Sequence, residues 1–292
     1  MLITIASGKG GTGKTTIAVN LALIIKEMLP VMLLDCDVEE PNAHLFLQPS
    51  FTQHRGVFTT VPKVDETKCD GCGRCSSFCA YGAIAIVEKQ PIIFPELCHS
   101  CGGCSLVCPT EAITEIPRKI GSVETGAGKG IQITKGSLAI GSPLAPVVVN
   151  AVRDTAPANH RGRVVIIDAS PGTSCSVVAA VQNTDFCLLV TEPTPFGLHD
   201  LALAVELATK LQLPYGVVIN RSGLGDSGVY DYCSEARIPI LMEIPFDTRY
   251  ASCYAKGGLL VEAFPDLKEQ FHNLWDRIRD RLASDKPPYA WG

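Results

Sequence analysis

A glycine- and lysine-rich loop near the N-terminus constrains the fold more than any other feature. Residues 8–16 read Gly-Lys-Gly-Gly-Thr-Gly-Lys-Thr-Thr. They lie between an apolar, β-leaning segment at 2–6 and a segment at 17–28 whose apolar residues recur at helical spacing. A second apolar segment follows at 31–34. This strand–loop–helix–strand order predicts an α/β fold, with a mostly parallel sheet and helices on its faces.

The same loop matches the pattern of a P-loop, which holds the phosphates of a nucleotide. Its glycines let successive backbone N–H groups turn toward phosphate oxygens, and the helix that begins near Lys14 adds its positive end. Lys14 would neutralise the β- and γ-phosphates, and Thr15 would ligate Mg²⁺. We therefore expect ATP and Mg²⁺ to bind, with contacts from Gly8, Gly10, Gly11, Thr12, Gly13, Lys14, Thr15 and Thr16.

Composition limits the class of partner. With 46% apolar residues among 292, the chain can bury a sizeable core in one or two domains. Its net charge of −5 gives no general basic field, so nucleic acid is not an expected partner. No secretory signal is visible, and no run approaches the roughly 18 apolar residues that a membrane span needs. We expect a cytoplasmic protein without a direct membrane anchor, in a compartment that keeps thiols reduced.

Eight of the thirteen cysteines form two runs of the pattern Cys-x2-Cys-x2-Cys-x3-Cys. The second run starts 29 positions after the first, which indicates an internal duplication. Ferredoxins hold two 4Fe–4S clusters at this spacing, each bound by three cysteines of one run and the fourth of the other. The predicted sets are Cys69, Cys72, Cys75 and Cys108 for one cluster, and Cys98, Cys101, Cys104 and Cys79 for the other. Zinc is the alternative, because Cys-x2-Cys pairs also suit tetrahedral zinc.

The cysteine-rich stretch interrupts the sheet pattern. We predict a P-loop ATPase domain made of residues 1–56 and 118–292, with a small α+β ferredoxin-like insert at 57–117. A Gly-rich stretch at 121–136 leads back to the sheet, and it could act as a flexible tether. Further apolar patterns predict strands at 164–167, 186–190, 216–219 and 239–243, and a final amphipathic helix from Pro265 that packs on the core.

The second lysine of the loop, Lys9, makes the likeness to one family specific. Residues 8–16 resemble the deviant Walker A loop of the MinD/ParA family, a group that includes nitrogenase iron protein and the Mrp-type iron–sulfur ATPases. The resemblance implies that Lys9 reaches across a homodimer, formed in the ATP state, to the partner's nucleotide. The alternative is an ordinary solvated loop lysine.

The resemblance covers the rest of the chain outside the insert. It implies that Asp37 is the switch I aspartate that orients the attacking water, supported by Asp35. Asp168 lies in a segment that looks like the Walker B strand and switch II, and it would hold Mg²⁺ through water. The implied catalytic residues of this ATPase are Lys9, Lys14, Asp37 and Asp168, and the implied base contacts are Asn220, Arg221 and Pro245.

The five other cysteines have different expected roles. Four of them look like small hydrophobes or helix residues without a partner: Cys36, Cys187, Cys253 and Cys233. Cys175 follows the switch II segment, where nitrogenase iron protein holds a cluster on its dimer axis with a second, upstream cysteine. No cysteine lies between Cys108 and Cys175, so a shared cluster on Cys175 is only an alternative.

Three functions fit these features. The first is an ATP-driven redox protein, in which nucleotide-dependent dimerisation gates electron flow from the clusters to a partner. The second is an iron–sulfur cluster assembly or carrier ATPase, against which the absence of a late Cys-x-x-Cys pair counts. The third is a MinD-like positioning ATPase of cell division, with a redox-sensing insert. A protein redox or assembly partner is expected, and the sequence does not identify it.

Overall fold

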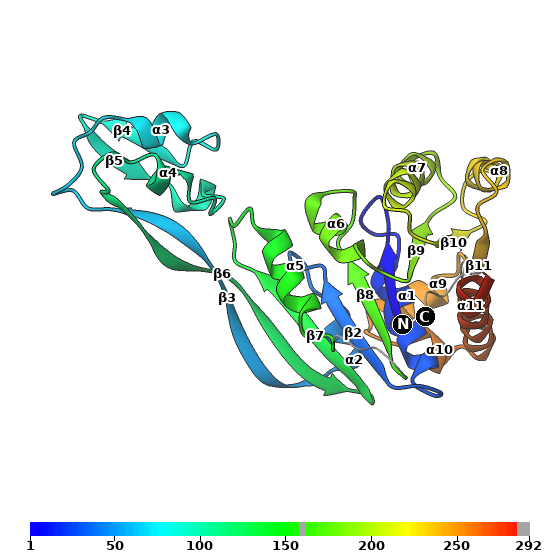
Figure 1. Cartoon of the computed structure of the whole chain (residues 1–292). Coiled ribbons are helices and arrows are strands. Elements are labelled where there is room, and N and C mark those ends of the chain that lie inside the picture. Colours follow the sequence, from blue (N-terminus) through cyan, green and yellow to red (C-terminus); the bar gives the residue numbers. More distant parts are fainter. Residues whose placement is uncertain (158–161, 285–292) are drawn as a thin grey trace, which may run out of the picture.

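The computed structural model describes residues 1–157 and 162–284. Its body is a nine-stranded sheet in the order β11-β10-β9-β1-β8-β2-β7-β6-β3 (Figure 1). The strands from β11 to β7 are all parallel, while β6 and β3 are antiparallel additions at one edge. This confirms the predicted α/β fold. The strands are β1 (Leu2–Ala6), β2 (Val31–Cys36), β3 (Ser50–Val64), β6 (Ile113–Gly128), β7 (Ile131–Leu138), β8 (Val164–Ala169), β9 (Phe186–Thr191), β10 (Tyr215–Ser222) and β11 (Ile240–Pro245).

Helices cover both faces of the sheet, and each layer has its own apolar core. Alternate residues of β1 show the division, because Ile3 packs with the α1 and α11 layer while Leu2 packs with the α5 to α8 layer. Strands buried on both faces read as continuous apolar runs, which is why the sequence showed them clearly. The helices are α1 (Lys14–Ile25), α2 (Ala43–Leu47), α5 (Ala145–Arg153), α6 (Cys175–Val181), α7 (Pro195–Lys210), α8 (Gly228–Glu235), α9 (Thr248–Ala255), α10 (Leu260–Ala263) and α11 (Pro265–Ser284).

The final helix, α11, lies against the body as expected. Its buried face consists of Leu267, Phe271, Leu274, Trp275 and Ile278. Met28, in contrast, was expected to continue the first helix, but it lies beyond the end of α1 and is half exposed. Across residues 1–157 and 162–284, no helix is long and apolar enough to cross a membrane.

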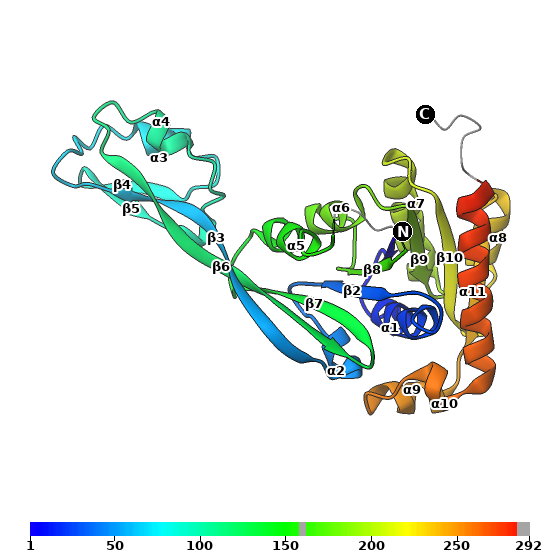
Figure 2. The same ribbon diagram turned by 60° about the horizontal axis from the view of Figure 1, so that its bottom comes forward.

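A long β-ribbon carries the cysteine-rich unit away from the body (Figures 1 and 2). β3 and β6 pair along their whole length, from Ser50 opposite Ala127 to Val64 opposite Ile113. Only the part of β6 from Gly121 onward also pairs with β7. The other part leaves the sheet with β3 as a two-stranded ribbon. The predicted domain boundary near residues 56 and 118 therefore falls inside continuous strands.

The alternative of a flexible tether at 121–136 is wrong, because this stretch forms the β6–β7 hairpin. Its glycines allow close packing. A Cβ at Gly126 would lie 2.2 Å from the carbonyl oxygen of Ser50, and one at Gly121 would lie 2.6 Å from that of Ser137. Glycine composition alone does not distinguish a linker from strands that pack this closely.

The cysteine-rich unit has internal two-fold symmetry that follows the sequence repeat. The hairpin of β4 (Ile84–Val87) and β5 (Gln90–Ile93) has the same register as the tips of β6 and β3, since Ile84 faces Ile93 as Ile113 faces Val64. The backbone N–H of Asp65 donates to the Ala112 carbonyl (2.7 Å), and that of Phe94 donates to Ala83 (2.8 Å). The two halves of the repeat are thus joined by equivalent backbone hydrogen bonds. Short helices α3 (Arg74–Phe78), η1 (Pro95–Leu97) and α4 (Gly103–Leu106) finish the unit.

Candidate functional site

The glycine-rich loop joins β1 to α1 in a conformation that only glycine accommodates at several positions. Gly11 and Gly13 have φ of +79° and +96°, in the left-handed region. A Cβ at Gly8 would lie 2.1 Å from the carbonyl oxygen of Asp200, and one at Gly13 would lie 2.5 Å from Asn220 Nδ2. The structure therefore gives a physical reason for these glycines, with the backbone amides at the start of α1 available to an anion.

Lys14 is the first residue of α1 and is almost fully buried. Its Nζ donates to Ser7 Oγ at 3.0 Å. Burial lowers the pKa of Lys14, and the nearby carboxylates of Asp168 and Asp37 oppose this shift. A buried ammonium beside a glycine loop favours binding of a phosphate group, because the negative charge of the phosphate offsets the cost of burying the ammonium.

Thr15 and Asp168 meet at the bottom of the loop. Thr15 Oγ1 donates to Asp168 Oδ2 at 2.5 Å, and Asp168 is fully buried at the end of β8. Within the described part of the chain, its other oxygen, Oδ1, receives no hydrogen bond, and the same holds for Thr12 Oγ1. Buried oxygens of this kind are the ligands that Mg²⁺ prefers, so the residues fit the predicted metal. Burial raises the pKa of Asp168 to about 7.

Asp35 is the next-to-last residue of strand β2 and Asp37, the predicted switch I aspartate, follows directly after that strand. Asp35 is fully buried and accepts hydrogen bonds from the backbone N–H of Ala43 (3.0 Å) and Asp37 (3.3 Å). Burial and the neighbouring Asp168 raise the pKa of Asp35 well above its usual range. Asp37 is partly exposed; burial raises its pKa, and Lys14 counteracts this. The structure thus brings Asp37 into the field of Lys14, on the phosphate side of the loop.

The predicted base contacts lie around one cavity of about 180 Å³ beside the loop. Asn220 Nδ2 donates to the Thr12 carbonyl at 2.8 Å, and Asn220 Oδ1 accepts from the N–H of Arg221 at 2.9 Å. The expected lining residues are Gly11, Gly13, Thr16, Asn220, Arg221 and Pro245. Sequence reasoning missed the aromatic part of the wall, Phe246, Tyr250 and Tyr254. The signal was available, since two tyrosines four apart follow directly after the Pro245 loop.

Lys9 is partly exposed and forms an ion pair, so it is not an ordinary solvated loop lysine. Its Nζ is 3.1 Å from Glu192 Oε2, while Glu192 Oε1 is 2.5 Å from Arg221 Nη1. Gly10 lies near Pro171, at the start of the switch II segment. Glu192 was not predicted. Its only sequence signal is its place directly after β9, at the carboxyl end of the strand. The phosphate loop follows the carboxyl end of the neighbouring parallel strand, β1.

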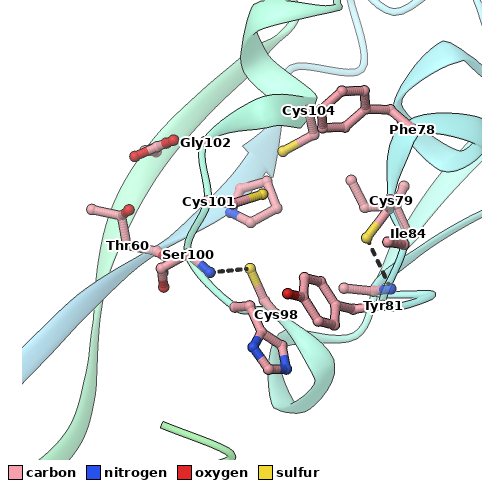
Figure 3. A pocket seen from close by; sticks show the side chains of 15 residues that line it. Thr60, Phe78, Cys79, Tyr81, Ile84, Cys98, Ser100, Cys101, Gly102 and Cys104 are labelled. Atoms are coloured by element: carbon pink, nitrogen blue, oxygen red, sulfur yellow. Dashed lines mark hydrogen bonds between the residues drawn. The ribbon is translucent and has the colours of Figure 1, made fainter. Parts of the chain in front are cut away.

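The eight predicted cluster cysteines separate into two groups of four, each around its own cavity. One cavity of about 240 Å³ is lined by Cys79, Cys98, Cys101 and Cys104, and Figure 3 shows their sulfur atoms around it. The other, of about 10 Å³, is lined by Cys69, Cys72, Cys75 and Cys108. These are the two sets expected from the crossed ferredoxin pattern. Within residues 1–157 and 162–284, no group of three or more His, Cys, Asp or Glu side chains is positioned to hold a metal ion. The ligand assignment stays a prediction.

Backbone N–H groups point at sulfur atoms in both halves. Ala83 donates to Cys79 Sγ and Ala112 to Cys108 Sγ, each at 3.3 Å, at equivalent positions of the repeat. Ser100 donates to Cys98 Sγ at 3.4 Å. Such bonds stabilise negative charge on sulfur, as a thiolate ligand requires, so the residues fit a cluster.

The two cysteine groups have different surroundings. The larger cavity is walled by Phe78 and by the stacked rings of Tyr81 and His99, whose centroids are 3.7 Å apart. The smaller one lies beside charged residues, Asp70 and Arg74. Ribbon residue Thr60 lines the larger cavity, whereas Val64, at the far end of β3, lines the smaller one. Along the ribbon, the larger cavity is therefore the one nearer the nucleotide-binding body.

Comparison with known proteins agrees with this geometry. The CobQ/CobB/MinD/ParA nucleotide binding domain matches residues 3–261. The chain belongs to this family.

Relatives of this CobQ/CobB/MinD/ParA chain cover nearly all of it. An uncharacterized protein of Methanocaldococcus jannaschii is 32% identical over 275 residues, spanning 94% of this chain and 96% of that protein. A protein of Pyrococcus horikoshii named iron-sulfur cluster carrier protein is 26% identical, spanning 97% and 87%. The septum site-determining protein MinD from Pyrococcus horikoshii, solved with Mg-ADP, covers 99% of both chains with a TM-score of 0.57 and 20% identity. The last comparison supports the fold alone.

The five other cysteines of this family member all lie in the body. Cys36 and Cys187 are buried, as expected for small hydrophobes, whereas Cys253, expected to be buried as well, is only half buried. Cys233 lies in a helix, as expected, and is buried in α8. Cys175 is exposed at the start of α6, just after the segment predicted to be switch II.

Proposed function

We propose that this chain is an ATPase that dimerises in its ATP state and couples its nucleotide cycle to a redox or partner-binding event at two 4Fe–4S clusters. The observation that carries the proposal is the placement of the cysteines. They form two crossed groups of four, on a ribbon that is part of the nucleotide-binding sheet.

The phosphate side of the proposal rests on four side chains. Lys14 would neutralise phosphate charge, and Thr15 with Asp168 would hold Mg²⁺. The metal would withdraw negative charge from the phosphates. Asp37 would accept a hydrogen bond from the attacking water and orient it, for which its carboxylate must be ionised. Lys14 favours that ionised form.

Lys9 would act on the nucleotide of the partner subunit. It lies at the outer side of the loop, with about a third of its side chain exposed. The long, flexible stem of a lysine side chain allows it to exchange an intrachain partner for an interchain one. This supports a role between subunits.

The clusters would be held by Cys69, Cys72, Cys75 and Cys108, and by Cys98, Cys101, Cys104 and Cys79. When bound, they supply one-electron transfer. The chain's own contribution is to direct N–H groups at the sulfur atoms and to shield the nearer site with Phe78, Tyr81 and His99.

A hydrogen-bonded route supports coupling between the two parts. Val38, next to Asp37, accepts from the N–H of Leu138 at 2.8 Å, and Ala139 donates to the Ile120 carbonyl at 2.8 Å. Ile120 lies where β6 leaves the sheet, at an irregularity in its pairing with β3. Farther out, Ser100 Oγ donates to the Thr60 carbonyl at 2.6 Å, beside the cysteines of the nearer site. A shift at switch I could therefore reach that site through paired strands.

Two measurements test the proposal. Anaerobically purified protein should contain about eight irons per chain and hydrolyse ATP. In addition, the cluster potentials should differ between the ADP state and the state with a non-hydrolysable ATP analogue. Stoichiometric zinc in place of iron would contradict the cluster proposal.

A carrier role is the second candidate, because several relatives bear the name iron-sulfur cluster carrier protein. Cys72 and Cys101 are exposed, so one ligand of each predicted cluster is accessible. Incubation with an apo-ferredoxin distinguishes the two candidates. Rapid ATP-dependent loss of iron to the acceptor favours the carrier, and retained clusters favour redox coupling.

A further inference from the structure

We propose that Glu192 holds Lys9 inside its own subunit, so that the Lys9–Glu192 ion pair competes with dimer formation. The inference rests on the proposed trans role of Lys9 and adds a positioning residue to it. It assigns Glu192 the task of setting how much ATP-bound protein is dimeric.

The geometry starts from one buried carboxylate with two cationic neighbours. Glu192 is 7% exposed, and its two oxygens contact different cations, Oε2 with Lys9 Nζ at 3.1 Å and Oε1 with Arg221 Nη1 at 2.5 Å. Lys9 belongs to the phosphate loop, and Arg221 follows Asn220 at the edge of the base cavity. Glu192 thus links the two halves of the nucleotide site.

The charge count explains why Lys9, rather than Glu192, is the partner that leaves. A buried carboxylate without a cation is strongly destabilising. When Lys9 leaves, Arg221 still compensates Glu192, and the remaining pair is neutral. Of the two cations that contact Glu192, Lys9 is therefore the one that can leave, because its release leaves no uncompensated charge behind.

Backbone packing also shows that Glu192 is held in place, whereas Lys9 can move. Glu192 follows β9, and its carbonyl oxygen accepts from the N–H of Thr194 at 2.8 Å. A Cβ on Gly197, in α7, would lie 2.1 Å from that carbonyl, so α7 packs directly on this segment. Glu192 is fixed on the sheet edge, while Lys9 has a flexible four-carbon stem that can turn to a second subunit.

Two substitutions should shift dimerisation in opposite directions. Glu192→Gln keeps the shape but removes the charge that holds Lys9, so Lys9 is released at no electrostatic cost and dimerisation tightens. Arg221→Gln leaves Lys9 as the sole cation of a buried carboxylate, so release becomes unfavourable and dimerisation weakens. A purely structural role for Glu192 predicts the same direction of change, a loss, for both variants.

The experiment measures the dimer dissociation constant by sedimentation at saturating non-hydrolysable ATP analogue, after nucleotide affinity has been measured for each variant. Glu206→Gln is the matched control, since Glu206 forms an exposed ion pair with Lys210 at 2.6 Å. We expect about five- to tenfold tighter dimerisation for Glu192→Gln, weaker dimerisation for Arg221→Gln, and no change for the control. In the nucleotide-free monomer, Lys9 should also react faster with an acylating reagent in Glu192→Gln.

The outcomes separate this inference from the proposed function. A parent protein that fails to dimerise with ATP analogue, or a Lys9→Ala variant that dimerises normally, contradicts the trans role itself. If the parent dimerises through Lys9 but Glu192→Gln dimerises equally or less, with unchanged Lys9 reactivity, the holding role of Glu192 is wrong and the proposed function stands.

Discussion

Asp35 and Asp168 lie directly opposite each other on the neighbouring parallel strands β2 and β8, and both side chains are fully buried. Burial raises the pKa of both carboxyl groups; repulsion by Asp168 adds to the shift of Asp35, and repulsion by Asp37 adds to that of Asp168. Bound Mg²⁺ would relieve this repulsion. The arrangement therefore destabilises the protein when no metal is bound and favours metal binding, as is common at functional sites.

The first prediction concerns the stability of protein free of nucleotide and magnesium. An acid with a higher pKa in the folded chain binds more protons when folded, so stability falls as pH rises between its unfolded and folded values. For Asp168 this window runs from 3.8 to about 7. Asp35→Asn removes one of the two charges and keeps an acceptor for the Ala43 N–H. Its stability relative to the parent should therefore increase as pH rises above about 4.

Denaturant unfolding at several pH values measures this difference. Asp280→Asn, at an exposed position of α11, is the matched control and should track the parent. A stabilisation by Asp35→Asn that is constant, or that shrinks as pH rises, would show that ionisation of this pair does not destabilise the empty protein.

The second prediction concerns magnesium. Because Mg²⁺ would bind the ionised form of Asp168, whose pKa is about 7, binding should release a proton below that pH. The Mg²⁺ affinity of the nucleotide-bound protein should then fall as the pH drops, by at most about tenfold per pH unit, the limit for one displaced proton. Titration calorimetry in two buffers with different ionisation enthalpies measures the proton. Affinity that is independent of pH would argue against Asp168 as a group that loses its proton on metal binding.

The third prediction separates three residues of the ATPase site. Lys14→Ala should abolish nucleotide binding, because it removes the buried cation of the phosphate loop. Lys9→Ala should retain binding but lose dimerisation and hydrolysis. Asp37→Ala should bind ATP and dimerise, yet hydrolyse it roughly 100-fold more slowly, since its task is to place the water. Fluorescent-nucleotide binding and phosphate release distinguish these patterns, and equal loss of binding in all three would indicate a general folding defect.

The fourth prediction uses the crossed cysteines. Cys108→Ser should disrupt the cluster whose other three ligands come from the first run, because Cys108 lies with Cys69, Cys72 and Cys75. Cys79→Ser should disrupt the other cluster. Each variant should keep about half of the iron, and the two should retain different electron paramagnetic resonance signals. Cys69→Ser should remove the same signal as Cys108→Ser. If it removed the signal that Cys79→Ser removes, the ligand sets would not be crossed.

What the sequence could predict here follows from how local each signal is. The phosphate loop, Asp168 and the cysteine runs are short patterns whose function depends on spacing along the chain, and the structure places their members together. The strands of the body were visible because burial on both faces leaves continuous apolar runs.

The features that were missed depend on distant partners. Glu192 contacts Lys9 and Arg221 from elsewhere in the chain, and no local pattern distinguishes it from any acid at a strand end. The ribbon was missed because Gly121 and Gly126 suggest a linker, although these glycines allow the carbonyls of Ser137 and Ser50 to approach closely. Pairing of strands determines that outcome, and a single sequence does not reveal pairing.

The last prediction is that nucleotide state and cluster potential are coupled through the ribbon. Coupling free energies between sites are commonly ~1–3 kcal/mol, and a tenfold change in relative affinity corresponds to about 59 mV for one electron. We therefore expect the nearer cluster, at Cys98, Cys101, Cys104 and Cys79, to shift by several tens of millivolts between the ADP and ATP-analogue states.

The contact between Ser100 Oγ and the Thr60 carbonyl offers a specific test, because it joins the ribbon to the loop that carries Cys98 and Cys101. Ser100→Ala should reduce the nucleotide-dependent shift without loss of iron. Ser105→Ala is the matched control, since its hydroxyl bonds only locally, to the Gly102 carbonyl at 2.7 Å, at a similar distance in sequence from a ligand. Potentiometric titration followed by electron paramagnetic resonance measures both variants.

Because equilibrium coupling is reciprocal, reduction must change ATP affinity by the same factor. Equal potentials in the two nucleotide states of the parent, together with equal ATP affinity in oxidised and reduced protein, would mean that the ribbon holds the clusters in place without transmitting the state of the nucleotide.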